Sequence, residues 1–258
     1  MRSMRVIRNL LALISCAWLV AAGDGIPAAA AASTAPAQPA ALLADPAVMG
    51  QWNGILLWPD KAVHSIMLHT GKVLWFRGEG IPASLSYTWD PVTNQIESQV
   101  IGAGVFCSGH SLLPDGRVLV EGGRVGLDST LGPRYTVIFD PLTQQWSEGP
   151  QMRAGRYYPT NVVLGDGRTL VFSGYDSTHT INEMVESFIP GTGPGGTDQW
   201  ELLAGANHYM GYYPRFHLLP SGLVLKVGHL PQAETLDPAT STWANVAPPS
   251  NYGGRKEG

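Results

Sequence analysis

Four short segments of the chain each place a glycine between two apolar runs, at nearly regular intervals. The four glycines, spaced 45, 51 and 55 residues apart, are Gly71, Gly116, Gly167 and Gly222. A glycine between two apolar runs is typical of a tight β-hairpin turn. A second turn signal of the form Asp-Pro-x-Thr follows in three of the four units, and begins at Asp90, Asp140 and Asp237. The sequence therefore predicts a unit of about four strands that repeats roughly every fifty residues.

Composition supports an all-β fold made of many short strands. The 258 residues include 31 glycines and 20 prolines, and no window has the spacing of a long amphipathic helix. The repeat length is that of a kelch-type propeller blade, and Gly122-Gly123 is the double glycine of such repeats. We predict an all-β, kelch-type β-propeller with about four four-stranded blades of an expected seven. The alternative, a β-sandwich with coincidental turns, does not explain why three kinds of marker recur in near register.

The N-terminus has the layout of a secretory signal peptide. Arg2, Arg5 and Arg8 precede an apolar run and an alanine-rich stretch, which predicts a signal peptide and cleavage region over residues 1–32 and a secreted, extracellular protein. The apolar run is too short for a stable membrane span. A lipoprotein cleavage box at Cys16 is the weaker alternative, because the apolar run continues beyond this cysteine.

The rest of the chain divides into a linker and the predicted blades. Residues 33–48, rich in alanine and proline, are expected to be a disordered linker, and residues 49–258 a partial propeller. The blades are expected near residues 50–100, 101–150, 151–203 and 204–249. The sequence Asn251-Tyr252-Gly253 resembles the entry to a fifth blade, so we expect the chain to be the N-terminal portion of a longer protein.

Net charge limits the range of partners. The chain carries a formal charge of −4, and removal of a leader that holds three arginines and no acid changes this to −7. An acidic protein is a poor match for nucleic acid or for an anionic membrane surface.

Cys107 is the only cysteine that remains once the signal segment is removed, and an unpaired thiol in a secreted protein needs an explanation. It lies nine residues before its turn glycine, and the equivalent residues of the other units are Ala62, Tyr158 and Tyr213. In a propeller, equivalent positions at the start of the innermost strands lie around one end of the central channel. We therefore expect Cys107 and Tyr158 to face each other across adjacent blades.

The segments around these two residues resemble those of a known enzyme family. Phe106-Cys107 and the sequence Arg156-Tyr157-Tyr158-Pro159, each before a turn glycine, are similar to the paired signatures of the galactose oxidase and glyoxal oxidase family of copper radical oxidases. In that family the cysteine sulfur is joined to the tyrosine ring, and this tyrosine binds copper and carries a radical. The resemblance implies that Cys107 is the thioether partner and Tyr158 the radical residue and copper ligand. Tyr157 is the rival, but the nine-residue count favours Tyr158.

The resemblance also implies a reaction and its cofactors. Oxidation of a primary alcohol or an aldehyde, including one on a carbohydrate, removes two electrons, whereas a single copper ion supplies one equivalent and an oxidisable phenol supplies the other. Oxygen would then be reduced to hydrogen peroxide. The implied cofactors are copper and the Cys-Tyr thioether radical, both expected only in the complete protein.

The family's remaining copper ligands, a tyrosine with an adjacent histidine and one further histidine, come from parts of the chain later than these repeats. The histidines of the repeats are expected to be structural or solvated; those considered are His110, His208, His217 and His229. Copper(II) commonly requires imidazole nitrogens beside oxygen donors. We therefore expect this chain alone neither to close a stable propeller nor to turn over substrate.

Substrate contacts are expected at the rim of the fourth blade. Tyr213 and Arg215 are the candidates for these contacts, but packing is the favoured role of Tyr213, because aromatic residues recur at blade starts. Galactose-specific family members have a stacking tryptophan shortly after the double glycine, where this chain has Tyr175-Asp176, so the pattern favours a glyoxal-oxidase-like or other alcohol or aldehyde substrate over galactose. The alternative function is a non-catalytic kelch-type module that binds a glycan or a protein.

Overall fold

The structure is a computed structural model that describes residues 46–52, 54–79, 84–126, 129–191, 196–228 and 232–246. The predicted signal segment, the expected start of a fifth blade and His229 lie outside these residues. The chain divides into two compact units, Met1–Ile55 and Leu56–Gly258. In the first unit, the one-turn helix α1 (Pro46–Met49) overlaps the end of the predicted linker. None of the described helices is long and apolar enough to cross a membrane.

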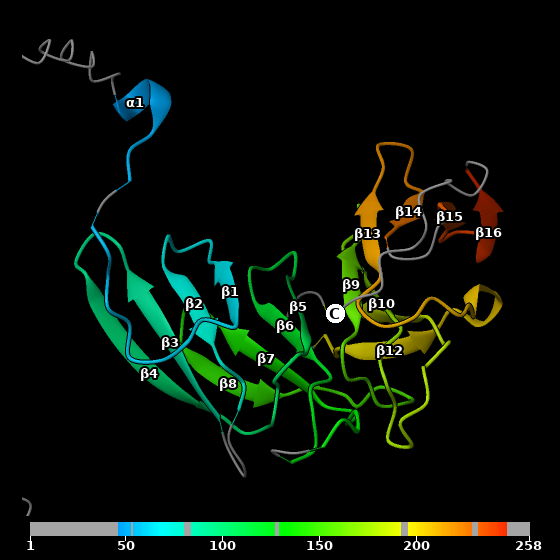
Figure 1. Ribbon diagram of the computed structural model, residues 1–258, viewed down its shortest axis with the longest axis horizontal. Helices are drawn as coiled ribbons and strands as arrows, with labels where there is room; N and C mark the ends of the chain where they lie inside the picture. The colour runs from blue at the N-terminus through cyan, green and yellow to red at the C-terminus, as the bar shows by residue number, and fades with distance from the viewer. Residues whose placement is uncertain are drawn as a thin grey trace, which may run out of the picture. The chain divides into compact units, whose positions relative to one another are not determined.

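The second unit consists of four antiparallel sheets, each built from four strands that are consecutive in the chain (Figure 1). The first sheet contains β1 (His64–Met67), β2 (Val73–Phe76), β3 (Ser84–Asp90) and β4 (Gln95–Ile101). The second contains β5 (Gly109–Leu112), β6 (Val118–Glu121), β7 (Thr136–Asp140) and β8 (Gln145–Glu148). The third contains β9 (Thr160–Val163), β10 (Thr169–Phe172), β11 (Glu186–Ile189) and β12 (Gln199–Leu202). After the short 3-10 helix η1 (Ala204–Ala206), the fourth contains β13 (Arg215–Leu218), β14 (Val224–Val227), β15 (Glu234–Asp237) and β16 (Thr242–Asn245).

The repeated turn signals form the hairpins that the sequence predicts. The four turn glycines lie between the first and second strands of their sheets, with φ from +82° to +90°. This left-handed region is readily open only to glycine, which explains why each unit uses one there. At the last hairpin of the first, second and fourth sheets, the aspartate side chain accepts a hydrogen bond from the backbone two residues later; the distances are 2.8 Å at Asp90, 2.8 Å at Asp140 and 2.9 Å at Asp237.

The hydrophobic core lies between successive sheets. One cluster joins the first and second sheets, with Phe76 and Phe139 as its largest fully buried members. A second joins the third and fourth sheets around Phe172, whose ring stacks on that of Phe216 at 4.0 Å. A smaller cluster, including Leu119 and Phe188, joins the second and third sheets. Apolar side chains are therefore buried between each pair of sheets that are consecutive in the chain.

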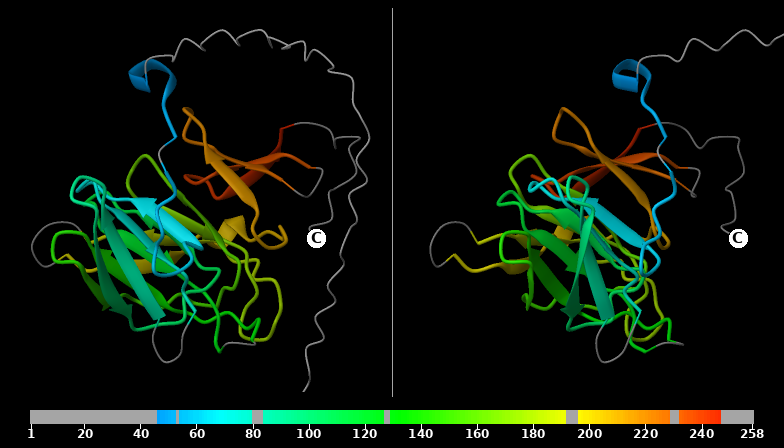
Figure 2. Two further views of the ribbon diagram at one scale, coloured as in Figure 1. Left: turned by 60° about the vertical axis from the view of Figure 1, so that its left-hand side comes forward. Right: turned by 90° about the vertical axis from the view of Figure 1, so that its left-hand side faces the viewer.

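Tryptophans of the outermost strands link the second and third sheets to the sheet before each of them. The indole N–H of Trp146 in β8 donates to Ser86 of the first sheet at 2.8 Å, and that of Trp200 in β12 donates to Thr136 of the second sheet at 3.0 Å. Figure 2 shows the same four sheets from two further directions. The prediction of an all-β fold with four four-stranded blades is confirmed, and in the described part of the chain the sheets form a series that is not closed into a ring.

Candidate functional site

Cys107, Tyr158 and Tyr213 occupy the same structural position in three successive sheets. Each lies two residues before its innermost strand and has a left-handed backbone, with φ of +56°, +65° and +47°. Such angles are uncommon for residues other than glycine. The backbone N–H of Tyr158 donates to the carbonyl of Cys107 at 3.1 Å, and that of Tyr213 donates to the carbonyl of Tyr158 at 3.0 Å. A chain of backbone hydrogen bonds thus brings the three residues together.

Their side chains form one cluster, which Tyr157 joins. The Cys107 side chain is buried, and it lies close enough to Tyr157, Tyr158 and Tyr213 to raise the pKa of each phenol. The ring centroid of Tyr158 lies 4.1 Å from that of Tyr157 and 4.7 Å from that of Tyr213. Tyr212 adds a further ring, 5.7 Å from that of Tyr158. We call these five residues the thiol–phenol cluster.

The electrostatics of the cluster favour the protonated phenols of Tyr157, Tyr158 and Tyr213. Burial raises the pKa of Tyr157 and of Tyr213 well above the usual value, and the nearby Cys107 raises both further. The hydrogen bond with Tyr157 lowers the pKa of Tyr158, but burial and Cys107 raise it by more, so its pKa is also raised. One-electron oxidation of such a neutral phenol to a phenoxyl radical also requires loss of its hydroxyl proton.

A buried ion pair supports the segment that carries both tyrosines. The side chains of Arg156 and Glu186 are fully buried and lie 2.8 Å apart, and Arg156 also donates to the carbonyls of Ser173 and Met184 at 2.8 and 2.9 Å. Gly122 of the double glycine packs against this segment, since a Cβ there would lie 2.3 Å from the Arg156 carbonyl. The predicted double glycine therefore permits the close approach of the next blade's loop.

The choice between Tyr157 and Tyr158 stays a prediction, because both side chains reach Cys107. Tyr157 is the more buried of the two, whereas Tyr158 has the left-handed backbone and the direct backbone bond to Cys107. The equivalence of Tyr158 with Cys107 and Tyr213, inferred from the nine-residue count, is visible in the backbone.

The three histidines considered from the sequence that fall within the described residues have surroundings outside the thiol–phenol cluster. His110 in β5 packs against His64, with ring centroids 5.2 Å apart; His208 stacks on Trp243 and interacts with Glu234 at 2.9 Å; His217 lies exposed in β13. The described residues include no group of three or more His, Cys, Asp or Glu side chains that could hold a metal ion. Because copper(II) commonly binds imidazole nitrogens, the phenols and thiol placed together here do not by themselves fit a copper centre.

The two expected substrate contacts, Tyr213 and Arg215, have different surroundings in the structure. Tyr213 joins the thiol–phenol cluster, and Arg215 lies exposed at the start of β13. Tyr175, at the position considered for a stacking tryptophan, exchanges two backbone hydrogen bonds of 2.7 Å with Tyr157. Its ring stacks on His179 at 4.2 Å and lies 5.6 Å from that of Tyr212, so it borders the cluster.

Sequence reasoning did not identify Tyr212, the Arg156–Glu186 pair or a buried acid, Glu121. A doubled tyrosine before the first strand, at residues 157–158 and again at 212–213, was a signal that could have identified Tyr212. No local pattern distinguishes Glu186 or Glu121 from an exposed strand glutamate. Their burial depends on which sheet packs against them.

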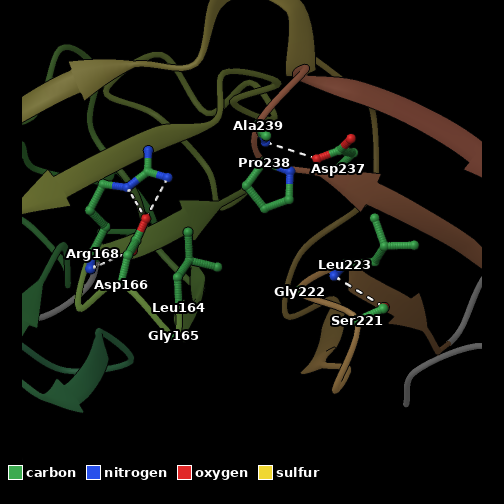
Figure 3. A pocket seen from close by; sticks show the side chains of 10 residues that line it. All are labelled: Leu164, Gly165, Asp166, Arg168, Ser221, Gly222, Leu223, Asp237, Pro238 and Ala239. Atoms are coloured by element: carbon green, nitrogen blue, oxygen red, sulfur yellow. Dashed lines mark hydrogen bonds and ion pairs between the residues drawn. The ribbon is translucent and has the colours of Figure 1, made fainter.

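A pocket lies beside the turn glycines of the third and fourth sheets (Figure 3). It encloses about 360 Å³ beside the hairpin turns at Gly167 and Gly222. Its charged groups are already engaged: Arg168 binds Asp166 at 2.8 Å, and the Asp237 carboxylate accepts from Ala239 at 2.9 Å. Each charged side chain of this pocket thus already has an ion-pair or hydrogen-bond partner within its own turn.

Comparison with known proteins identifies relatives of this chain. No protein family model matches it. Galactose oxidase of Gibberella zeae is 26% identical over 154 residues, which are 55% of this chain and 22% of that protein. Aldehyde oxidase GLOX of Vitis pseudoreticulata is 32% identical over 135 residues, which are 50% of this chain and 24% of that protein. The chain thus matches about a quarter or less of the length of these relatives. Among solved structures, a fungal alcohol oxidase of the AA5 family in complex with copper has a TM-score of 0.36 and 15% identity, covering 71% of this chain and 64% of that one.

Proposed function

This chain is a relative of the galactose oxidase and glyoxal oxidase family, and we propose that it carries the thiol–phenol part of a related secreted oxidase. The reaction would convert a primary alcohol to an aldehyde, or an aldehyde hydrate to an acid, with transfer of two electrons and two protons to oxygen to give hydrogen peroxide. Cys107 and Tyr158 would form the redox-active pair.

The contact between Cys107 and Tyr158 carries this proposal. Two residues from different sheets, 51 positions apart in the chain, are held by a backbone hydrogen bond of 3.1 Å while their side chains interact. A generic buried cysteine would pack among apolar side chains. Here the thiol instead lies near three tyrosine side chains, whose phenols are its possible partners in oxidation.

The pair can form a thioether by a balanced reaction. The cysteine S–H and one ring C–H of the tyrosine are lost, a C–S bond forms, and the two hydrogens reduce one oxygen molecule to hydrogen peroxide. The sulfur substituent then makes the phenol easier to oxidise by one electron. Tyr158 is half-buried, which would shield such an oxidised ring in part from solvent and from other reductants.

Copper binding by this chain would need ligands beyond the described residues. The cluster offers oxygen and sulfur donors, and no histidine of the described part contacts Cys107 or Tyr158. We propose that Tyr158 is one ligand of such a centre. Tyr213 and Arg215 are proposed to lie beside the substrate, Tyr213 because it touches Tyr158 and Arg215 because its charge is exposed two residues later.

The test is the intact mass and peptide map of the secreted full chain after exposure to copper(II) and oxygen. We propose that the cross-link itself, unlike turnover of substrate, needs only the contact of the two side chains and an oxidant, so we expect a loss of about two hydrogens relative to the unoxidised chain and a linked peptide pair that contains Cys107 and Tyr158. The Cys107→Ser variant is the matched control and should keep its unoxidised mass. An unchanged wild-type mass with a freely alkylated Cys107 would contradict the proposal and favour a non-catalytic binding module.

A further inference from the structure

Glu121 is a fully buried acid that the proposed reaction does not use. It is the last residue of β6, it lies opposite Gly109 in the sheet, and its exposure is 0%. A Cβ on Gly109 would lie 1.9 Å from its Oε1 atom, so the carboxyl group occupies the space that any other side chain at residue 109 would need. The side chain therefore crosses over β5 toward the next sheet.

The carboxyl group reaches Asn161 in the third sheet. Asn161 Nδ2 donates to the two oxygens of Glu121 at 2.9 and 3.1 Å, and Asn161 lies in β9, the innermost strand of its sheet. Fully buried Arg156 lies close enough to influence Glu121 electrostatically, but its guanidinium is engaged by Glu186. Asn161 is thus the side chain that hydrogen-bonds the acid in the described part of the chain.

This contact lies directly behind the redox-active pair. Gly109 follows Cys107 by two residues, and Asn161 follows Tyr158 by three. The second and third sheets are consequently joined twice: by the backbone bond from Tyr158 to Cys107, just before β9 and β5, and one step further along by the side chains of Glu121 in β6 and Asn161 in β9.

Energetics indicate that this contact has a role beyond stability. A buried acid or polar pair can often be replaced by apolar side chains of similar volume with little loss, whereas removal of one partner leaves the other unsatisfied at considerable cost. A hydrogen-bonded pair differs from an apolar contact in that it has a defined direction and distance. It can therefore specify the separation of two strands that apolar packing would leave adjustable.

We infer that the Glu121–Asn161 contact, which joins β6 to β9, is a positioning device that holds the second and third sheets at the separation where Cys107 lies beside Tyr158. Both are positioning residues, since neither contacts the reacting atoms. Only the chemical consequence, efficient cross-linking, rests on the proposed function. The positioning itself can be measured through the accessibility of the thiol.

The experiment compares variants of the full chain by the rate at which a thiol reagent labels Cys107. Asn161→Leu keeps the side-chain volume and removes the donor, and we expect labelling about tenfold faster, because an unsatisfied buried acceptor promotes local opening by a factor of that order. Asn161→Ser, with a hydroxyl too short to bridge, gives the same test with a smaller perturbation. Glu121→Gln keeps size and hydrogen bonding and should label within about twofold of wild type.

The control for a general loss of stability is Val224→Ala, which creates a cavity in the fourth sheet. Val224 is fully buried in β14. If Val224→Ala accelerates labelling as much as Asn161→Leu, or if neither Asn161 variant accelerates it, the inference is wrong. The cross-link yield with copper(II) and oxygen is the second readout, and should fall in the Asn161 variants alone. Failure of the wild type to cross-link would count against the proposed function, while the labelling rates would still decide the positioning role.

Discussion

Arg156 and Glu186 form an ion pair in which both side chains are fully buried, directly before the two tyrosines that meet Cys107. The second oxygen of Glu186 accepts a hydrogen bond from the backbone N–H of Arg153 at 2.6 Å, so one carboxylate holds the loop at two points. Burial lowers the pKa of Arg156, and Glu186 opposes that effect by favouring the charged guanidinium. The loop that presents Tyr157 and Tyr158 thus depends on a charge pair in the interior.

Removal of one member of this pair should destabilise the protein strongly. For Glu186→Gln we expect a loss of about 3–5 kcal/mol in the free energy of unfolding, because an uncompensated buried guanidinium remains. Urea unfolding followed by tryptophan fluorescence measures it. Asp166→Asn is the matched control, since it removes an ion pair with Arg168 that is largely exposed, and should cost less than about 1 kcal/mol. Equal losses of unfolding free energy for the two substitutions would show that the buried ion pair stabilises the protein no more than the surface pair does.

Two substitutions, each of which removes one tyrosine hydroxyl group, can identify the tyrosine that is linked to Cys107. We expect Tyr158→Phe to lose the cross-link to Cys107 under copper(II) and oxygen, because a phenylalanine ring is not readily oxidised. Tyr157→Phe should retain the linked peptide, since Tyr158 keeps its backbone bond to Cys107. Peptide mapping of both variants gives the answer. The reverse result would assign the role to Tyr157, whose side chain also reaches the thiol.

The repeat architecture was predictable because its signals are local. A hairpin turn requires a left-handed backbone at one residue, so glycine appears at residues 71, 116, 167 and 222, and the spacing of these turns defines the blades. The neighbouring positions of Cys107 and Tyr158 were predictable for the same reason, because equal distance from equivalent turns gives equivalent positions in adjacent sheets.

The residues around Cys107 and Tyr158 were not predictable, because their positions depend on contacts between sheets. Glu121 ends β6 with a sequence context that fits an exposed or a buried strand end, and only the packing of β9 against β5 buries it. Likewise, Tyr157 would point away from Tyr158 in a regular strand, but both rings meet because the left-handed backbone at Tyr158 interrupts the alternation.

The buried acid should make stability depend on pH. Burial raises the pKa of Glu121 to about 8, whereas an unfolded glutamate titrates near 4.5. A raised native pKa means that the folded state holds a proton that the unfolded state releases, so the stability present below about pH 4.5 is progressively lost up to about pH 8. The total change should be a few kcal/mol, since one pKa unit corresponds to about 1.4 kcal/mol.

Urea unfolding of the wild type and of Glu121→Gln between pH 5 and pH 9 measures this effect. The glutamine variant, which cannot ionise, should lose most of the slope. Substitution of the exposed Glu148 by glutamine is the control and should leave the slope almost unchanged. Parallel curves for wild type and Glu121→Gln would mean that Glu121 is ionised in the folded protein at neutral pH.

Substitution of Gly109 tests the surroundings of Glu121 by a steric conflict rather than by a change of charge. Its φ is not in the left-handed region, so alanine there meets no backbone strain, and the conflict is with the end of the Glu121 side chain. Gly109→Ala should therefore displace the carboxyl group from Asn161 and cost about 1–3 kcal/mol in unfolding free energy, the penalty of a buried polar group without its partner. Gly102→Ala is the matched control, because nothing lies within 4 Å of a Cβ at that residue.

The double variant Gly109→Ala with Glu121→Ala distinguishes this explanation from a general intolerance of alanine. Once the carboxyl group is absent, the added methyl has room, and Gly109→Ala should cost nothing or stabilise slightly through its higher strand propensity. The two substitutions should consequently be non-additive by about 1 kcal/mol or more, as expected of residues in direct contact. Additive effects in denaturant unfolding would show that Glu121 does not occupy the space above Gly109.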